Sequence, residues 1–130
     1  MARKSSRGNE TGSRLRDILE RLDGLDRLSY GKFSIKGRVQ IYSRKSKVFD
    51  SGRKSSLDVE LTSCSRTDTH GRCYKIRVGG KSMVVSSVGR WTLCQSDEKV
   101  SQVYLRAPIL GQVYLDGSLL EKDYNEIVII

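Results

Sequence analysis

The segment CYKIRVGGKSMVVS, residues 73–86, is the clearest structural signal in the chain. Two runs of strand-forming residues flank Gly79-Gly80, a pair that tolerates the positive φ angles of a two-residue primed turn. That turn places Val78 opposite Lys81 and so fixes the register of the hairpin. One face is then apolar, with Tyr74, Ile76, Val78, Met83 and Val85, and the other carries Lys75, Arg77, Ser82, Val84 and Ser86.

A second alternating segment spans residues 32–42 and predicts a strand with one apolar and one basic face. Phe33, Ile35, Gly37, Val39 and Ile41 form the apolar face, and Lys32, Ser34, Lys36, Arg38, Gln40 and Tyr42 the polar face. Residues 32–54 hold eight basic residues and one acidic residue, Asp50. An ordinary solvated strand face is the alternative, but solubility does not require charge of one sign.

The composition indicates one basic domain with a tail. The 130 residues carry a formal charge of +9, yet residues 95–130 carry −3, so the first 94 residues carry +12. This asymmetry favours a part that meets a polyanion and a part with another role, such as self-association. No apolar run approaches the roughly 20 residues of a membrane span, so we expect a protein of the cytosol or nucleus.

The remaining segments complete an expected α+β fold, a mixed or antiparallel sheet with helices on one face. We expect a disordered basic arm over residues 1–12 and a single domain over residues 13–130. Within the domain, the spacing of apolar residues predicts helices over 13–23, capped by Ser13, and over 91–105, ended by Pro108. Residues 43–56 are expected to form a loop, 57–61 a strand, 66–71 a turn, and 109–115 a strand that turns at Asp116-Gly117.

The apolar end of the chain, residues 127–130, leaves two alternatives open. A β-branched, uncharged end suits an edge strand that joins a second copy, and it equally suits a last strand buried within the domain.

The sequence contains few candidate residues for catalysis or for metal binding. The single histidine, His70, lies in a predicted turn without a motif that marks a nucleophile, so we expect no enzyme and no cofactor. The sparse, odd-numbered cysteines are expected to be reduced thiols. A zinc site formed by Cys64, His70, Cys73 and Cys94 is an alternative, although its spacing is not that of a standard zinc knuckle.

RNA is the ligand that the two basic strand faces favour. Lysine and arginine neutralise phosphates, and serine and glutamine side chains can hydrogen-bond to ribose 2′-hydroxyls. The few aromatic residues expected on these faces favour duplex RNA over single strands. The candidate RNA-binding residues are Lys32, Ser34, Lys36, Arg38, Gln40, Lys75, Arg77, Ser82 and Ser86, with Arg44 and Lys45 at the rim.

Three short segments resemble a known family. The hairpin of residues 73–86 resembles the central hairpin of the RNA-silencing suppressors of tombusviruses, and the chain length suits their shorter aureusvirus relatives. Residues 30–36 resemble the first basic strand of that family, and Ala107-Pro108-Ile109 the start of its last strand. The resemblance implies a homodimer that sequesters small interfering RNA on a concave sheet, with Lys32, Lys36, Arg77, Ser82 and Ser86 as contacts.

This chain departs from the family in the part that measures duplex length. The tombusvirus proteins stack paired tryptophans on the duplex ends, whereas the only tryptophan here, Trp91, follows the hairpin. We therefore expect weak length selection and binding of long duplexes as well. The other readings of the sequence are a viral or ribosomal structural protein that coats RNA without specificity, and a zinc-stabilised interaction module.

Overall fold

A computed structural model describes residues 6–28, 31–44, 46–64, 72–95, 100, 102–121 and 125–130. These residues form one helix, α1 (Ser6–Leu28), and two antiparallel sheets, which confirms an α+β fold with antiparallel sheets. The prediction of a second helix is wrong for the described residues. No helix in the described ranges is long and apolar enough to span a membrane.

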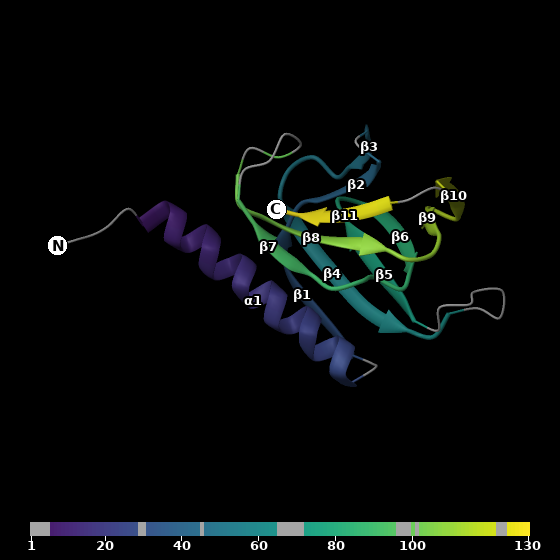
Figure 1. The fold of residues 1–130 in the computed structure, drawn as a ribbon, viewed down its shortest axis with the longest axis horizontal. Coiled ribbons are helices and arrows are strands. Elements are labelled where there is room, and N and C mark those ends of the chain that lie inside the picture. The colour runs from purple at the N-terminus through teal and green to yellow at the C-terminus, as the bar shows by residue number, and fades with distance from the viewer. Residues whose placement is uncertain are drawn as a thin grey trace.

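The two sheets pack face to face, with α1 along one open side (Figure 1). Sheet A has the strand order β1-β4-β5-β6-β9-β10 and sheet B the order β3-β2-β11-β8-β7. The strands of sheet A are β1 (Gly31–Gly37), β4 (Ser55–Thr62), β5 (Cys73–Val78), β6 (Lys81–Ser86), β9 (Val113–Leu115) and β10 (Ser118–Glu121). Those of sheet B are β2 (Val39–Ser43), β3 (Ser46–Asp50), β7 (Thr92–Cys94), β8 (Tyr104–Ile109) and β11 (Asn125–Ile129).

The apolar stripe of α1 completes the main core. Leu15, Ile18, Leu22 and Leu25 recur every three or four residues, and all four are buried against the inner faces of both sheets. The helix contacts β1 of sheet A and β7 and β8 of sheet B, so it bridges the two sheets. It begins at Ser6, seven residues before the predicted start, so residues 6–12 are helical and not a disordered arm. Residues 1–5 lie outside the described residues.

The predicted strand over residues 32–42 is in fact two strands in different sheets. The chain leaves sheet A at Gly37 and enters sheet B at Val39, and Arg38 between them exchanges two backbone hydrogen bonds with Ile130. Gly37 is buried, and a Cβ there would lie 3.1 Å from Leu57 Cδ2. The alternating pattern did not indicate this crossing, because the pattern continues unbroken through residues 38–42. The polar side of that segment is nevertheless covered in the fold.

The β5–β6 hairpin forms in the predicted register. Val78 pairs with Lys81, and Tyr74, Ile76 and Met83 are buried in the main core. Gly79 and Gly80 both have positive φ angles, 58° and 79°, as the primed turn requires. The predicted strand over residues 57–61 is confirmed within β4, whereas the turn predicted at 66–71 lies outside the described residues.

Two predicted segments are wrong. Residues 43–56 are not a continuous loop, because β3 forms there and pairs with β2. Residues 91–105 are not a helix, because β7 and the start of β8 form there, and Pro108 lies inside β8. The helix-like spacing arose because Trp91 is buried in the main core while Val100 and Tyr104 are buried in a smaller cluster with Tyr42, Val128 and Ile130.

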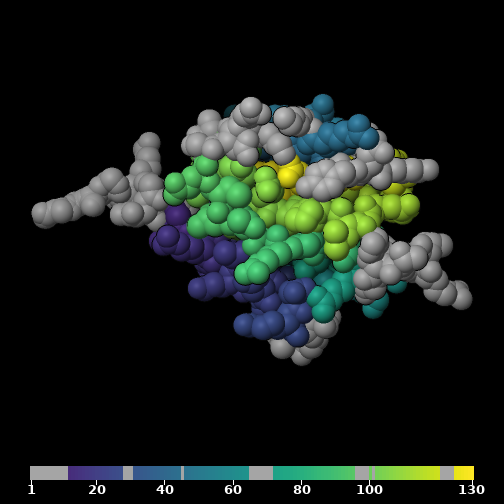
Figure 2. All heavy atoms as spheres, viewed as in Figure 1, coloured from purple at the N-terminus to yellow at the C-terminus, as the bar shows by residue number. Residues whose placement is uncertain are grey.

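The C-terminal strand is an interior strand. β11 lies between β2 and β8, and residues 125–130 are all buried. In Figure 2 only a small part of this yellow strand is visible between the blue and green surfaces. Of the two alternatives for the apolar end, the buried strand is therefore confirmed and the dimer strand is wrong. The strand predicted over residues 109–115 is shorter, β9, and it turns at Asp116-Gly117 as expected.

Candidate nucleic-acid interface

Six of the predicted RNA-binding residues lie together on the outer face of sheet A. Alternation along β1, β4, β5 and β6 turns every second side chain into the core and leaves the others outside. We define the outer face by the residues that project from these four strands: Lys32, Ser34, Lys36, Ser56, Asp58, Glu60, Lys75, Arg77, Ser82 and Val84.

The register arranges these side chains in rows across the strands. One row runs Lys32, Glu60, Lys75, and the next runs Ser34, Asp58, Arg77. A carboxylate on β4 therefore stands between the cations of β1 and those of β5. Four cations and two carboxylates lie on the outer face, so this face carries a net positive charge.

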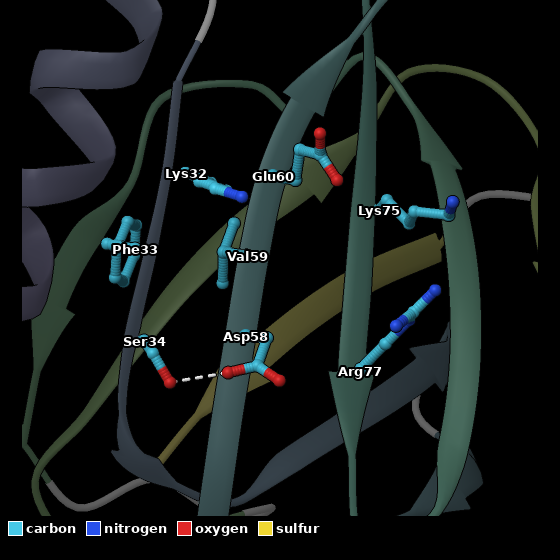
Figure 3. Close-up of a pocket in the computed structure, with 8 residues that line it drawn as sticks. All are labelled: Lys32, Phe33, Ser34, Asp58, Val59, Glu60, Lys75 and Arg77. Carbon is cyan, nitrogen blue, oxygen red and sulfur yellow. Dashed lines mark hydrogen bonds between the residues drawn. The ribbon is translucent and has the colours of Figure 1, made fainter.

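The centre of the outer face is a shallow hollow of about 500 Å³ (Figure 3). Its walls include Lys32, Asp58, Glu60, Lys75 and Arg77. In Figure 3, Lys32 extends from β1 toward β4, and Ser34 donates a hydrogen bond to Asp58. Lys75 and Arg77 extend away from β4, which leaves their charged ends open to a ligand.

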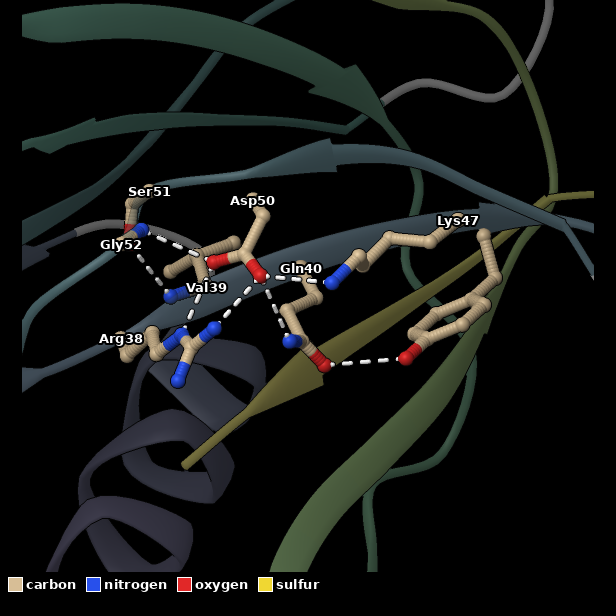
Figure 4. A network of polar contacts seen from close by, with 8 residues as sticks. Arg38, Val39, Gln40, Lys47, Asp50, Ser51 and Gly52 are labelled. Atoms are coloured by element: carbon tan, nitrogen blue, oxygen red, sulfur yellow. Dashed lines mark hydrogen bonds and ion pairs between the residues drawn. The ribbon is translucent and has the colours of Figure 1, made fainter. Parts of the chain in front are cut away.

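Arg38 and Gln40 do not belong to this face, so their predicted placement on one strand face with Lys32 is wrong. Arg38 forms an ion pair with Asp50 at 2.6 Å, and Gln40 donates to the same carboxylate at 3.0 Å (Figure 4). Gln40 is buried and accepts a hydrogen bond from the Tyr42 hydroxyl. These residues lie on the crossing between the sheets, where a satisfied polar network is formed.

Asp50 is the centre of that network. The hydrogen bond from Arg38 lowers the pKa of Asp50 most strongly, and hydrogen bonds from Lys47, the Gly52 amide and Gln40 lower it further, while burial opposes them. The same contact raises the pKa of Arg38. Asp50 is therefore ionised in the folded protein, and its carboxylate stabilises the β2–β3 hairpin.

The other three predicted site residues are dispersed. Ser86 projects from the same side of β6 but is buried, so a ligand on the outer face cannot reach it without a rearrangement. Arg44 is exposed at the turn between β2 and β3, in sheet B. Lys45 lies outside the described residues.

A group of cations at one end of β1 extends the positive surface. Burial lowers the pKa of Lys54, and the nearby charges of Arg14, Arg38 and Lys36 lower it further. Arg14 comes from α1 and donates to the Lys36 carbonyl at 2.9 Å, which ties the helix to this end of sheet A. The repulsion among these cations would be relieved by a bound anion.

The sequence interpretation missed the two carboxylates of the interface. Asp58 and Glu60 alternate with the apolar residues of β4, but their position depends on which strands flank β4. The reversal predicted between residues 61 and 73 could have indicated the position of these carboxylates, because a reversal makes β4 and β5 adjacent antiparallel strands.

The cysteines also differ from expectation. Cys64 and Cys73 form a disulfide that links the end of β4 to the start of β5, so they are not reduced thiols. A disulfide cannot supply two thiolate ligands, and Cys94 lies in β7 of sheet B. The structure therefore does not support the alternative of a zinc site formed by these cysteines. No metal-binding cluster of histidine, cysteine, aspartate or glutamate is present in the described part of the chain. His70 lies outside that part.

Comparisons of this chain with family models, with curated proteins and with solved structures found no match.

Proposed function

We propose that the chain binds duplex RNA on the outer face of sheet A. The observation that carries the proposal is the placement of four cations, Lys32 and Lys36 on β1 and Lys75 and Arg77 on β5, on either side of a polar strand. Lys32, Lys36 and Arg77 are exposed and Lys75 is half-buried, so no described segment covers them. Such cations would neutralise phosphates of a nucleic-acid backbone.

The spacing of the cations favours an extended polyanion over a small one. β1 and β5 are separated by two strand spacings, about 10 Å. Cations at that separation can meet different phosphates of one ligand. Tyr114 of β9 is the one aromatic side chain that the register places in line with this face among the described residues, and it is half-buried. A face with so little stacking surface suits a duplex better than unpaired bases.

The polar groups between the cations favour RNA over DNA. A ribose 2′-hydroxyl can donate to a carboxylate and accept from a serine. Asp58, Ser34 and Ser82 offer these partners in one row. Deoxyribose has no 2′-hydroxyl, so the carboxylates of β4 would repel DNA phosphates without a compensating hydrogen bond.

The biological role that we propose is suppression of RNA silencing in a plant host, by sequestering small interfering and longer duplex RNA. It is supported by the resemblance of the β5–β6 hairpin to the tombusvirus suppressors and by the outer-face positions of Lys32, Lys36, Arg77 and Ser82. We further propose that the protein acts as a homodimer in the host cytoplasm or nucleus. β11 is an interior strand of sheet B. Sheet A has two described edge strands, β1 and β10, and α1 contacts β1, so β10 is the edge that would join two sheets.

The direct test is the double variant Lys32→Ala/Lys75→Ala in a binding titration with a short RNA duplex. If both lysines contact phosphate, affinity falls about 5- to 100-fold at low salt, and the slope of log affinity against log salt is smaller by about 2. The matched control, Arg27→Ala/Arg90→Ala, removes the same charge beside Trp91, away from the outer face. Equal losses in the two double variants would contradict a binding face on sheet A.

A further inference from the structure

The Cys64–Cys73 disulfide lies at the edge of the outer face of sheet A. Cys73 is the first residue of β5, and the alternation of that strand places its side chain on the same side as Lys75, two residues further on. Thr62 of β4 and Ser86 of β6 pair with Cys73, in the row next to that of Lys75. The crosslink therefore borders the surface proposed to bind RNA, at the end of β5 that lies away from its glycine turn.

The pairing and packing of sheet A do not depend on the sulfur atoms. Neither Cys64 nor Cys73 belongs to a hydrophobic core cluster of the described residues. β4 and β5 pair over six residues of each strand, and Leu61 and Tyr74 next to the crosslink are buried on the inner face. The two cysteines are only nine residues apart in the sequence, and a disulfide that closes a short loop stabilises less than one that closes a long loop. The disulfide can therefore open while the sheet stays folded.

The two sulfur atoms differ in access to solvent. Cys73 is 4% exposed, whereas Cys64 is partly exposed. A thiolate from solution therefore reaches Cys64 Sγ and forms a bond to it, and the electron pair of the broken S–S bond leaves on Cys73 Sγ, which takes up a proton from water. A second thiolate then attacks the added sulfur of this mixed disulfide. That step releases the Cys64 thiol and the oxidised form of the small thiol.

We propose that the Cys64–Cys73 disulfide is an exchange site for low-molecular-weight thiols, and that its opening loosens the Lys75 end of the outer face. The proposal rests on the proposed function, because a protein of the cytoplasm or nucleus meets such thiols, and disulfides there are seldom permanent. Strand ends open more readily than strand centres. Lys75 lies two residues from the released end of β5, whereas Arg77 lies close to the turn at the other end.

The exchange is tested by treating the oxidised full chain with glutathione at several ratios of its reduced and oxidised forms. Samples are quenched with acid, alkylated and analysed by peptide mass spectrometry. We expect the disulfide to open as reduced glutathione increases, with the mixed disulfide on Cys64. Cys94→Ser, which removes the free thiol of β7, is the control and should give the same result. A disulfide that stays intact in excess reduced glutathione, or a mixed disulfide on Cys73 alone, would overturn the proposal.

Amide NMR spectra of the oxidised and reduced chain show whether the opening is local. We expect changed amides at Thr62, Cys73 and Lys75, and unchanged amides at Gly80 and Ile127. Loss of dispersed signals throughout the spectrum would mean that the fold requires the disulfide, which would also overturn the proposal. Cys64→Ser/Cys73→Ser should match the reduced wild type, and the reduced wild type remains the deciding sample if that variant does not fold.

Titration of both redox forms with a short RNA duplex tests the consequence for binding. The reduced chain should bind about 2- to 5-fold more weakly, because one phosphate contact is less well positioned. Lys75→Ala should bind equally in the two redox states. Equal affinity of oxidised and reduced wild type would refute the effect on the outer face and leave RNA binding as proposed. An absence of RNA binding in both forms would instead refute the proposed function, while the glutathione and NMR results would still decide the exchange site.

Discussion

At the scale of single residues, Asp58 distinguishes the proposed interface from a general cationic surface. Its carboxylate lies between Ser34 and Arg77 in a row across the strands. A surface that only attracts phosphates would bind better without it. In our account Asp58 also accepts from a ribose hydroxyl, so it costs affinity for DNA and contributes to affinity for RNA.

Asp58→Asn should therefore change the two ligands unequally. We expect DNA duplex to bind more tightly, because a negative charge is removed, and RNA duplex to bind about as before or more weakly. The preference for RNA should fall by about 3- to 10-fold, as the loss of one charge-assisted hydrogen bond implies. Equal gains on RNA and DNA would show that Asp58 contacts no 2′-hydroxyl. Thr62→Ala, a change to another exposed position on β4, serves as the control.

Asp50 has a structural role, and its effect should depend on pH. Hydrogen bonds, above all from Arg38, hold its pKa below the ordinary 3.8, so the carboxylate contributes stability above that value. The contribution declines as pH falls below 3.8, because the unfolded chain then takes up a proton, and it is fully lost only when the folded-state carboxyl is protonated as well. Asp50→Asn should lower the free energy of unfolding by about 2 kcal/mol at pH 6.

The measurement is urea denaturation of the wild type and Asp50→Asn at pH 6 and pH 3. The difference between the two proteins should be smaller at pH 3. An undiminished difference at pH 3 would mean that the charge of Asp50 is not what stabilises the β2–β3 hairpin. Asp17→Asn, in an exposed pair with Arg21 on α1, should change stability little at either pH.

At the scale of elements, the sequence predicted the helix and the hairpin, which form through contacts between residues close in the chain. The Gly79-Gly80 turn fixed the register of the β5–β6 hairpin, and the spacing of Leu15, Ile18 and Leu22 identified α1. The hairpin prediction also placed Lys75, Arg77 and Ser82 on one face before any tertiary contact was considered. Helix and hairpin arise from contacts between residues close in the chain, so their patterns are visible in the sequence.

Signals that depend on distant partners were misinterpreted. Gln40 and Tyr42 are polar residues on an alternating strand, and they are buried because a second cluster covers that face of sheet B. Trp91 and Tyr104 have helical spacing but are buried on opposite faces of one sheet. The Cys64–Cys73 disulfide likewise depends on β4 and β5 being neighbours. None of these partners can be identified from periodicity alone.

The two glycines of the turn provide a matched test of the hairpin. Both have positive φ angles, so alanine is strained at either position by roughly 1 kcal/mol. A Cβ at Gly79 would also lie 3.3 Å from the Ser51 carbonyl oxygen, whereas a Cβ at Gly80 meets nothing within 4 Å. Gly79→Ala should therefore lower the melting temperature more than Gly80→Ala. The reverse order would contradict the packing of the turn against Ser51.

At the scale of the whole molecule, the two faces of sheet A have separate roles. Its inner face joins α1 and sheet B in one core, and its outer face leaves the cations of β1 and β5 exposed. The division explains how a small chain can keep a positively charged surface open, because folding depends on the other face. Only some of the basic residues of the sequence share this face, because their positions depend on how the strands pair.

The measurement that tests the central claim most directly is one titration of the purified chain at two salt concentrations. Its four labelled ligands are a short RNA duplex, a long RNA duplex, single-stranded RNA and a DNA duplex of matched length. We expect both RNA duplexes to bind in preference to the other two ligands, with affinity that falls steeply as salt rises. Equal affinity for all four ligands would contradict the account, because a nonspecific polycation would then explain the binding.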